Sequence, residues 1–241
     1  PQSVLTGRLA ESWETPDATT MVFKIRQGVH WHNKAPMNGR ELTAKDIEYN
    51  FHRVWGLGSG FTAPHETYSG PLARIPVESV TATDSNTVVF ELKQPQLGAL
   101  QPILIDYGAF ILPPEVIQQH GDVKEWRNLV GTGPFMLSDW VDGSSTTWTR
   151  NPDYWGFDEK FPENRLPYFD GLRALIMKEP ATILAAMRSG QVDYVGYIGV
   201  AQMLYTAEKE SIERTNPEIA FYPWSVRSEN AFAFNMSKDT P

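Results

Sequence analysis

A strand-turn-strand unit between residues 131 and 155 constrains the fold of this chain more than any other segment. The letters GTGP at 131–134 open a strand, because glycine and proline interrupt helices and mark the starts of extended segments. A turn with the letters DGS at 142–144 reverses the chain into a second strand at 145–149. Tyr154 and Trp155 close the unit and are expected to pack over the sheet, since large aromatic side chains are mostly buried. The unit indicates a protein that holds a ligand rather than one that transforms it.

Composition excludes several classes of protein. The chain of 241 residues is 41% apolar and carries a formal charge of −8, so it is long and apolar enough for one large or two modest cores. Nucleic-acid binding needs clustered Lys and Arg, which the negative charge disfavours. There are no cysteines, so disulfides and thiolate metal sites are excluded. No apolar run reaches the length of a membrane span, about 18 residues.

Periodicity predicts an α+β first half. Alternation predicts a strand at 21–26 and a hairpin that joins 79–83 to 88–92, with Val88, Phe90 and Leu92 pointing inward. Thr43 is expected to cap a helix whose Ile47, Phe51, Val54 and Trp55 face the core. A short helix is expected from the prolines at 113–114 to Gly121, with a second one capped by Asp122.

The second half is expected to contain an α/β unit. The apolar run 172–177 is typical of a strand buried on both faces, and Pro180 and Gly190 bound a helix. A strand at 191–197 then completes a parallel strand-helix-strand unit. A helix around 201–213 and strands at 219–224 and 231–235 are expected to follow.

No local cluster demands catalysis or a metal. His30 and His32 have metal-ligand spacing but lack a third ligand, and His52 is expected to be solvated. Asp153, Asp158 and Glu159 offer carboxylates, but nothing local makes two of them converge as acid-base chemistry requires. The glycines at 131 and 133 are no dinucleotide fingerprint, because Pro134 and a strand follow them. We therefore predict no cofactor and no enzymatic activity.

The order of the landmarks resembles the large solute-binding proteins of ABC importers, in the oligopeptide- and dipeptide-binding family. Seven segments carry the resemblance: LAESW at 9–13, FKIRQGVHWH at 23–32, LTAKDI at 42–47, GTGPF at 131–135, RNPDYW at 150–155, RSGQVD at 188–193, and FN at 234–235 with Pro241. The resemblance implies a fold of the type II periplasmic-binding-protein kind. It implies an extracytoplasmic monomer, possible lipid anchoring in a longer protein, peptide as ligand, and a membrane permease as partner.

The resemblance also implies a domain organisation. Residues 1–128 look like the extra subdomain of this family, and residues 129–241 like most of lobe one up to the hinge. The chain starts without an initiator Met, so we expect a longer protein with a second lobe, and only weak ligand binding by residues 1–241 alone.

Polar and aromatic loops are placed at the ligand cleft by the same resemblance. The predicted ligand-binding residues are His65, Asp106, Tyr107, Tyr197, Trp224, Val226 and Asn230. Three alternatives stay open. One is the same family with a nickel chelate, an oligosaccharide or an opine-like compound as cargo. The others are a carbohydrate-active hydrolase and a peptide-responsive regulator built on the same fold.

Overall fold

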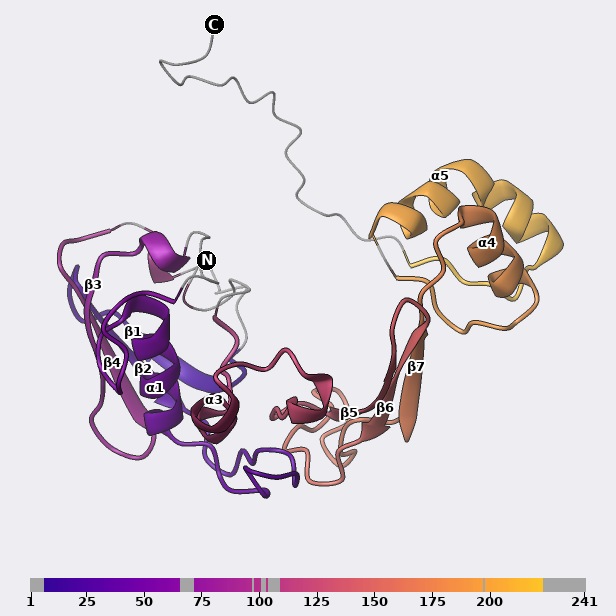
Figure 1. Cartoon of the computed structure of the whole chain (residues 1–241). Coiled ribbons are helices and arrows are strands. Elements are labelled where there is room, and N and C mark those ends of the chain that lie inside the picture. The colour runs from indigo at the N-terminus through magenta and orange to yellow at the C-terminus, as the bar shows by residue number, and fades with distance from the viewer. Residues whose placement is uncertain are drawn as a thin grey trace, which may run out of the picture. The chain divides into compact units, whose positions relative to one another are not determined.

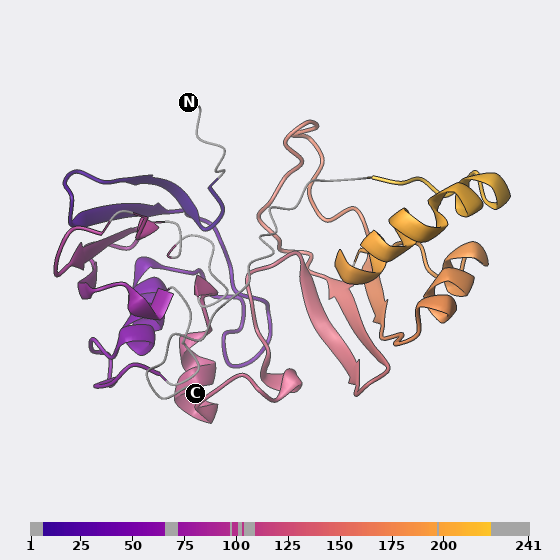
Figure 2. The ribbon, with the colours of Figure 1, turned by 90° about the horizontal axis from the view of Figure 1, so that it is seen from above.

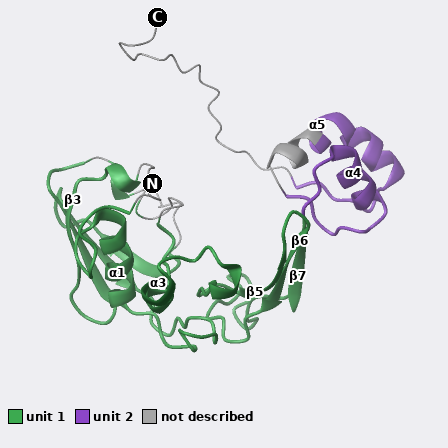
Figure 3. Ribbon diagram, viewed as in Figure 1, with its two compact units in different colours: residues 1–175 green, residues 176–241 purple. Residues whose placement is uncertain are grey.

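The computed structural model describes residues 7–65, 72–96, 98–100, 103, 109–196 and 198–222. The chain falls into two compact units, residues 1–175 and 176–241 (Figure 3). The boundary expected near residue 128 therefore lies inside the first unit. The division into an extra subdomain and a first lobe stays a prediction about the longer protein.

The first unit contains a four-stranded antiparallel sheet with the order β1-β2-β4-β3 (Figure 1). Its strands are β1 (Ala10–Glu14), β2 (Thr20–Ile25), β3 (Val77–Ala82) and β4 (Thr87–Leu92). Val88, Phe90 and Leu92 are buried, as their alternation predicts. The predicted strand at 21–26 and the predicted hairpin are both confirmed.

Helix α1 (Ala44–Trp55) packs against this sheet, and buried side chains of the helix and the sheet together form a hydrophobic core (Figures 1 and 2). The Phe90 ring lies 5.1 Å from Phe23 and 5.0 Å from Phe51, both edge to face, and Phe51 stacks on Trp55 at 5.3 Å. Edge-to-face and offset contacts are the favoured aromatic geometries, so this cluster fixes the helix on the sheet. The predicted start of the helix after Thr43 is confirmed, and Gly56 ends it in the left-handed conformation.

Two short helical segments lead out of this core. Helix α3 (Pro114–His120) ends at Gly121 as predicted. The next segment is a 3-10 turn (Trp126–Asn128), and its cap is Glu125, whose side chain accepts the Arg127 N–H. The prediction of Asp122 as the cap is wrong, because its carboxylate accepts the Lys124 N–H and closes a local turn instead. A further 3-10 turn, Leu72–Arg74, precedes β3.

The second sheet of this unit is also antiparallel, with the order β5-β6-β7. The hairpin of β5 (Phe135–Val141) and β6 (Ser145–Arg150) confirms the predicted strand-turn-strand unit, with Gly143 at a φ of +64° in its turn. Strand β7 (Gly171–Leu175) is exposed throughout, so the prediction of a strand buried on both faces is wrong. It is an edge strand in the described part of the chain, and an apolar run alone cannot report what covers it.

The second unit contains α4 (Pro180–Arg188) and α5 (Ile198–Thr215). The helices pack through Ile183, Ala186, Leu204 and Ile212, which are buried. Residues 191–196 form no strand, and β7 pairs antiparallel with β6, so the predicted parallel strand-helix-strand unit is wrong for the described residues. A strand needs a neighbour for its N–H and C=O groups, and no described residue offers one to 191–196.

The last predicted strands are only partly covered by the described residues. Residues 219–222 form no strand, and 223–241 lie outside the described part. None of the described helices is both long and apolar enough to cross a membrane.

Candidate functional site

The polar edge of α1 is the described part of the chain that bears on the predicted ligand site. Asn50 and Arg53 interrupt the apolar stripe of this helix, and both are buried, at 1% and 3% exposure. The side-chain Oδ1 of Asn50 accepts the Leu112 N–H at 3.1 Å, while the Nδ2 of the same amide has no partner among the described residues. Buried polar groups are normally hydrogen-bonded, so an unpaired amide marks a place where a polar neighbour is expected.

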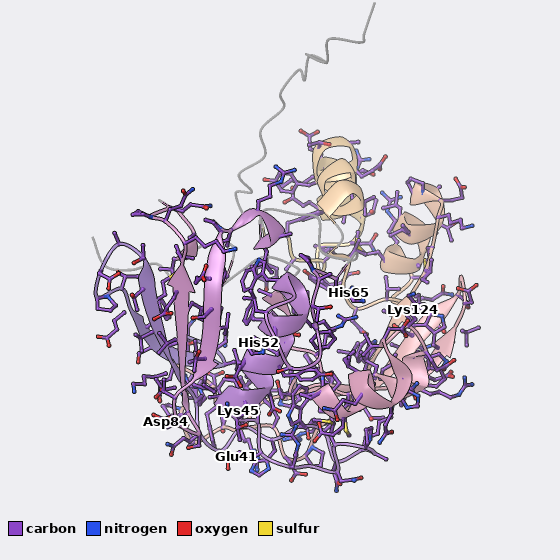
Figure 4. The ribbon with its side chains drawn as sticks, turned by 60° about the vertical axis from the view of Figure 1, so that its left-hand side comes forward. Glu41, Lys45, His52, His65, Asp84 and Lys124 are labelled. Carbon is purple, nitrogen blue, oxygen red and sulfur yellow. The ribbon has the colours of Figure 1, made fainter. Side chains whose placement is uncertain are left out.

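His65 joins this edge from the loop after α1 (Figure 4). Its backbone N–H donates to the Arg53 carbonyl at 3.2 Å, and the Arg53 guanidinium donates to His65 Nε2 at 2.8 Å. An imidazole nitrogen that accepts from a guanidinium carries no proton, so the hydrogen of the neutral ring sits on Nδ1. The half-buried side chain is thereby oriented by the helix.

Of the seven predicted ligand-binding residues, His65 is the one that the structure describes. The other six lie outside the described residues: Asp106, Tyr107, Tyr197, Trp224, Val226 and Asn230. The grouping of His65 with Asn50 and Arg53 was missed from the sequence. Its signal was two polar residues, three apart, on the buried side of a predicted amphipathic helix.

His52 and His30 make hydrogen bonds within the first unit. His52, predicted to be solvated, is half-buried, and its ring contacts Ser59 Oγ at 2.9 Å and the Val80 carbonyl at 2.8 Å. That prediction is wrong, because the loop after α1 and strand β3 close over the helix. His30 is exposed and bonds to the Gly39 carbonyl. Within the described ranges, no three His, Asp or Glu side chains are grouped to hold a metal.

His32 connects the segment after β2 to the strand-turn-strand unit at 131–155. Its Nδ1 accepts the Gly131 N–H at 3.1 Å, and its Nε2 lies 3.0 Å from the Gly133 carbonyl. Asn151 also donates to the Gly133 carbonyl, at 3.0 Å. Burial, with a smaller contribution from Lys34, lowers the pKa of His32, although the Gly133 carbonyl opposes this shift. The GTGP segment is therefore a structural joint held by a neutral histidine.

Among the carboxylates at 153–159, Asp158 is held by the loop that carries it. Asp158 accepts the Tyr168 hydroxyl at 2.8 Å and the N–H groups of Lys160 and Phe161 at 2.7 and 3.0 Å. The Tyr168 hydroxyl, followed by the two N–H groups, lowers the pKa of Asp158. A half-buried carboxylate that is stabilised in this way organises a loop and is poorly suited to be a general acid.

Comparison with known proteins places this arrangement in context. The sequence model for "Bacterial extracellular solute-binding proteins, family 5 Middle" matches residues 4–239. The chain is 27% identical to the probable D,D-dipeptide-binding periplasmic protein DdpA of Escherichia coli over 90% of its length. It is 26% identical to the dipeptide-binding protein of the same organism over 85% of its length. It spans 38% of each of these relatives.

Two solved structures share both fold and sequence with the chain. The periplasmic binding protein DppA of Helicobacter pylori, in complex with the peptide STSA, has a TM-score of 0.60 and 26% identity. The match covers 77% of this chain and 36% of that one. The binding protein MoaA of A. tumefaciens R10, in complex with mannopinic acid, has a TM-score of 0.60 and 27% identity over 78% of this chain and 34% of that one.

Proposed function

The chain belongs to the bacterial extracellular solute-binding proteins, family 5, and from this membership we propose that it is part of the peptide-capturing component of an ABC importer. The family match over residues 4–239 carries the proposal. Relatives named as dipeptide-binding proteins, and the likeness to a structure that holds a peptide, support peptide as the ligand class. The relatives are binding proteins, so we infer no enzymatic activity.

The proposed mechanism needs no chemistry. A ligand that contacts two lobes more strongly when they are closed shifts the population toward the closed form. The closed, loaded protein then delivers the peptide to a membrane permease. We infer a periplasmic or extracellular location, since relatives are named as periplasmic, and a monomeric whole protein that is either free or lipid-anchored.

We assign residues 1–128 to the extra subdomain and 129–241 to most of lobe one. The chain spans 38% of the relatives compared above, so it accounts for part of the ligand site. We propose contacts from His65, Asp106, Tyr107, Tyr197, Trp224, Val226 and Asn230. The oriented imidazole of His65 and the unpaired Asn50 amide support the first of these contacts, because peptide main chains offer both donors and acceptors.

An opine-like cargo is the second candidate. The structure with mannopinic acid matches the chain as well as the one with a peptide does. Nickel chelates and oligosaccharides are further cargoes to be tested. A glycoside hydrolase and a peptide-responsive regulator built on the same fold are the remaining alternatives.

The test is mass spectrometry of ligand that co-purifies with the whole protein, followed by calorimetry with di- to pentapeptides and with mannopinic acid. We expect peptides in the first experiment and saturable peptide binding in the second. His65→Ala is expected to weaken binding by roughly tenfold, or about 1.4 kcal/mol. His120→Ala, at an exposed histidine of α3, is the matched control and should change nothing.

Other outcomes would overturn parts of the proposal. Binding of mannopinic acid without peptide binding would establish the opine reading. Turnover of a glycoside that Asp106→Asn abolishes would establish the hydrolase. Tight peptide binding by residues 1–241 alone would contradict the assignment of the chain to part of the site.

A further inference from the structure

A crevice on the first unit shares no lining residue with the polar edge of α1 and has a different chemistry. It has a volume of about 580 Å³ and is formed by the first two strands together with the segment that follows the β5–β6 hairpin. Its principal side chains are Glu11, Arg26, Asn86, Trp155, Phe157 and Arg165. This volume lies within the range of small-molecule pockets, about 300–1,000 Å³.

Cationic groups outnumber anionic ones in the crevice, although the whole chain carries a charge of −8. Glu11 is paired with Arg26 at 3.4 Å. Arg165 donates through Nε to the Tyr154 carbonyl at 2.6 Å, and no carboxylate pairs with it among the described residues. The Nε bond holds the guanidinium in place while its other N–H groups keep their donor capacity. The crevice therefore presents one uncompensated, oriented cation.

Aromatic side chains supply an apolar wall. The Arg26 guanidinium lies 4.9 Å above the Trp155 ring, an arrangement favoured by the charge distribution of the indole. The Phe157 ring is 53% exposed, although phenylalanine is normally buried. An exposed ring beside an oriented cation offers a stacking surface for a flat apolar group.

The segment that carries Phe157 and Arg165 is held by its own hydrogen bonds. Phe157 and Arg165 form a β-bridge, and the Leu166 N–H donates to the Gly156 carbonyl at 3.0 Å. Asp158 accepts two backbone N–H groups and the Tyr168 hydroxyl. Such preorganisation lowers the entropy that a ligand must overcome on binding.

We propose that this crevice is a second ligand site, for a small carboxylate that bears an aromatic or other flat apolar group. The carboxylate pairs with Arg165, a bidentate geometry that guanidinium groups favour, and the flat group stacks on Phe157. The Asn86 amide, for whose side chain no protein partner is recorded among the described residues, adds a neutral hydrogen-bonding group beside the pair. The site is independent of peptide capture, so its failure would leave the proposed function standing.

The test uses ¹⁵N-labelled protein of residues 1–241 and the probe 3-phenylpropanoate. The indole N–H signal of Trp155, assigned by its loss in Trp155→Phe, reports occupancy of the crevice. We expect the signal to shift saturably with the carboxylate, and at least fivefold more weakly with the neutral amide 3-phenylpropanamide. Raising the salt concentration should weaken the binding of the carboxylate, because added ions screen a partly exposed charge pair.

Substitutions inside and outside the crevice distinguish binding in the crevice from nonspecific attraction of the carboxylate to any exposed arginine. Arg165→Gln should weaken binding about fivefold, the size of one charge-assisted contact at a partly exposed position. Arg127→Gln is the control, because Arg127 is an exposed arginine like Arg165 but does not line the crevice; it pairs with Glu125 at 3.0 Å and lies 4.5 Å over the Trp126 ring. Phe157→Ala changes an exposed side chain and should weaken binding without unfolding the protein.

Three results would overturn the proposal. The first is an absence of any shift of the Trp155 signal, and the second is an equal shift by the carboxylate and the amide. The third is an equal loss of binding in Arg165→Gln and Arg127→Gln. Should Arg165→Gln fail to fold, Phe157→Ala and the comparison of the carboxylate with the amide still test the proposal.

Discussion

Replacing Asp46 by asparagine should destabilise the first unit far more than the same change at the exposed Asp139. Asp46 is 4% exposed and lies in the first turn of α1. Its carboxylate accepts two bonds from Arg40, at 2.7 and 2.8 Å, and the Thr43 N–H at 2.9 Å. Trp31 Nε1 also approaches it, at 3.4 Å. One side chain thus caps the helix and anchors the loop before it.

The size of the loss in stability follows from the hydrogen bonds that the asparagine amide cannot make. Asparagine keeps one acceptor oxygen but turns an N–H₂ group toward the guanidinium, so at least one charge-assisted bond becomes a clash of donors. Breaking a buried pair costs about 3–5 kcal/mol, and a bond to a charged group about 1.5–3 kcal/mol. Arg40 is 35% exposed and also bonds to Glu115, at 2.6 and 2.8 Å, so it stays partly satisfied. We therefore expect a loss at the lower end, about 2–3 kcal/mol, or roughly 4–12 °C in Tm.

The assay is urea denaturation followed by tryptophan fluorescence. All tryptophans except Trp224 lie within residues 1–175, so the signal reports mainly on the first unit. Asp139→Asn makes the same chemical change at an exposed position of β5 and should cost less than about 0.5 kcal/mol. The reasoning is refuted if Asp46→Asn costs no more than Asp139→Asn. A double-mutant cycle with Arg40→Gln should show losses that do not add, because both changes remove the same bonds.

Two further predictions concern the joint and a helix end. Burial lowers the pKa of His32 in the folded protein below its ordinary value of 6.5. As the pH falls, His32 therefore takes up a proton in the unfolded chain at a higher pH than in the folded protein. The free energy of unfolding should therefore fall as the pH drops below 6.5. Urea midpoints measured between pH 5 and 8 should depend less on pH in His32→Gln than in the unchanged protein. An equal dependence on pH in both proteins would contradict the buried, neutral state of His32. Gly56→Ala and Gly28→Ala both place alanine at a φ near +70°, at a cost of about 1–2 kcal/mol each. At Gly56 the new Cβ would also meet the Ala63 backbone within 2.4 Å, whereas at Gly28 it meets nothing within 4 Å. Calorimetry should show the lower Tm for Gly56→Ala, and equal values would refute the steric argument.

Local elements could be predicted because their signals lie within a few residues of one another. Thr43 and Asp46 mark the start of α1, and the glycines at 121 and 143 mark a helix end and a hairpin turn. Period-two alternation placed Val88 and Phe90 in the core. These features depend on capping, on the φ angles open to glycine and on the pleat of a strand, all of which neighbouring residues determine.

The candidate site was only partly predictable. His65 was proposed from a family resemblance, and its bond to Arg53 required the fold of the loop onto the helix. The apolar run at 172–177 was read as a doubly buried strand, but periodicity does not report which strand lies beside it or what covers its faces. The same limit applies to His52, whose polar surroundings come from Ser59 and from β3.

The amino-acid sequence by itself determined the helices, the hairpins and the family, because each rests on residues close together in the chain or on their order along it. The tertiary structure alone decided the joint at His32, whose partners lie about 100 positions away at Gly131 and Gly133. It also decided the crevice, which brings Glu11 and Arg26 beside Trp155 and Arg165. The joint and the crevice both depend on contacts between residues far apart in the chain. Burial and charge set the free energy of such contacts, and no local sequence pattern shows which distant residues meet.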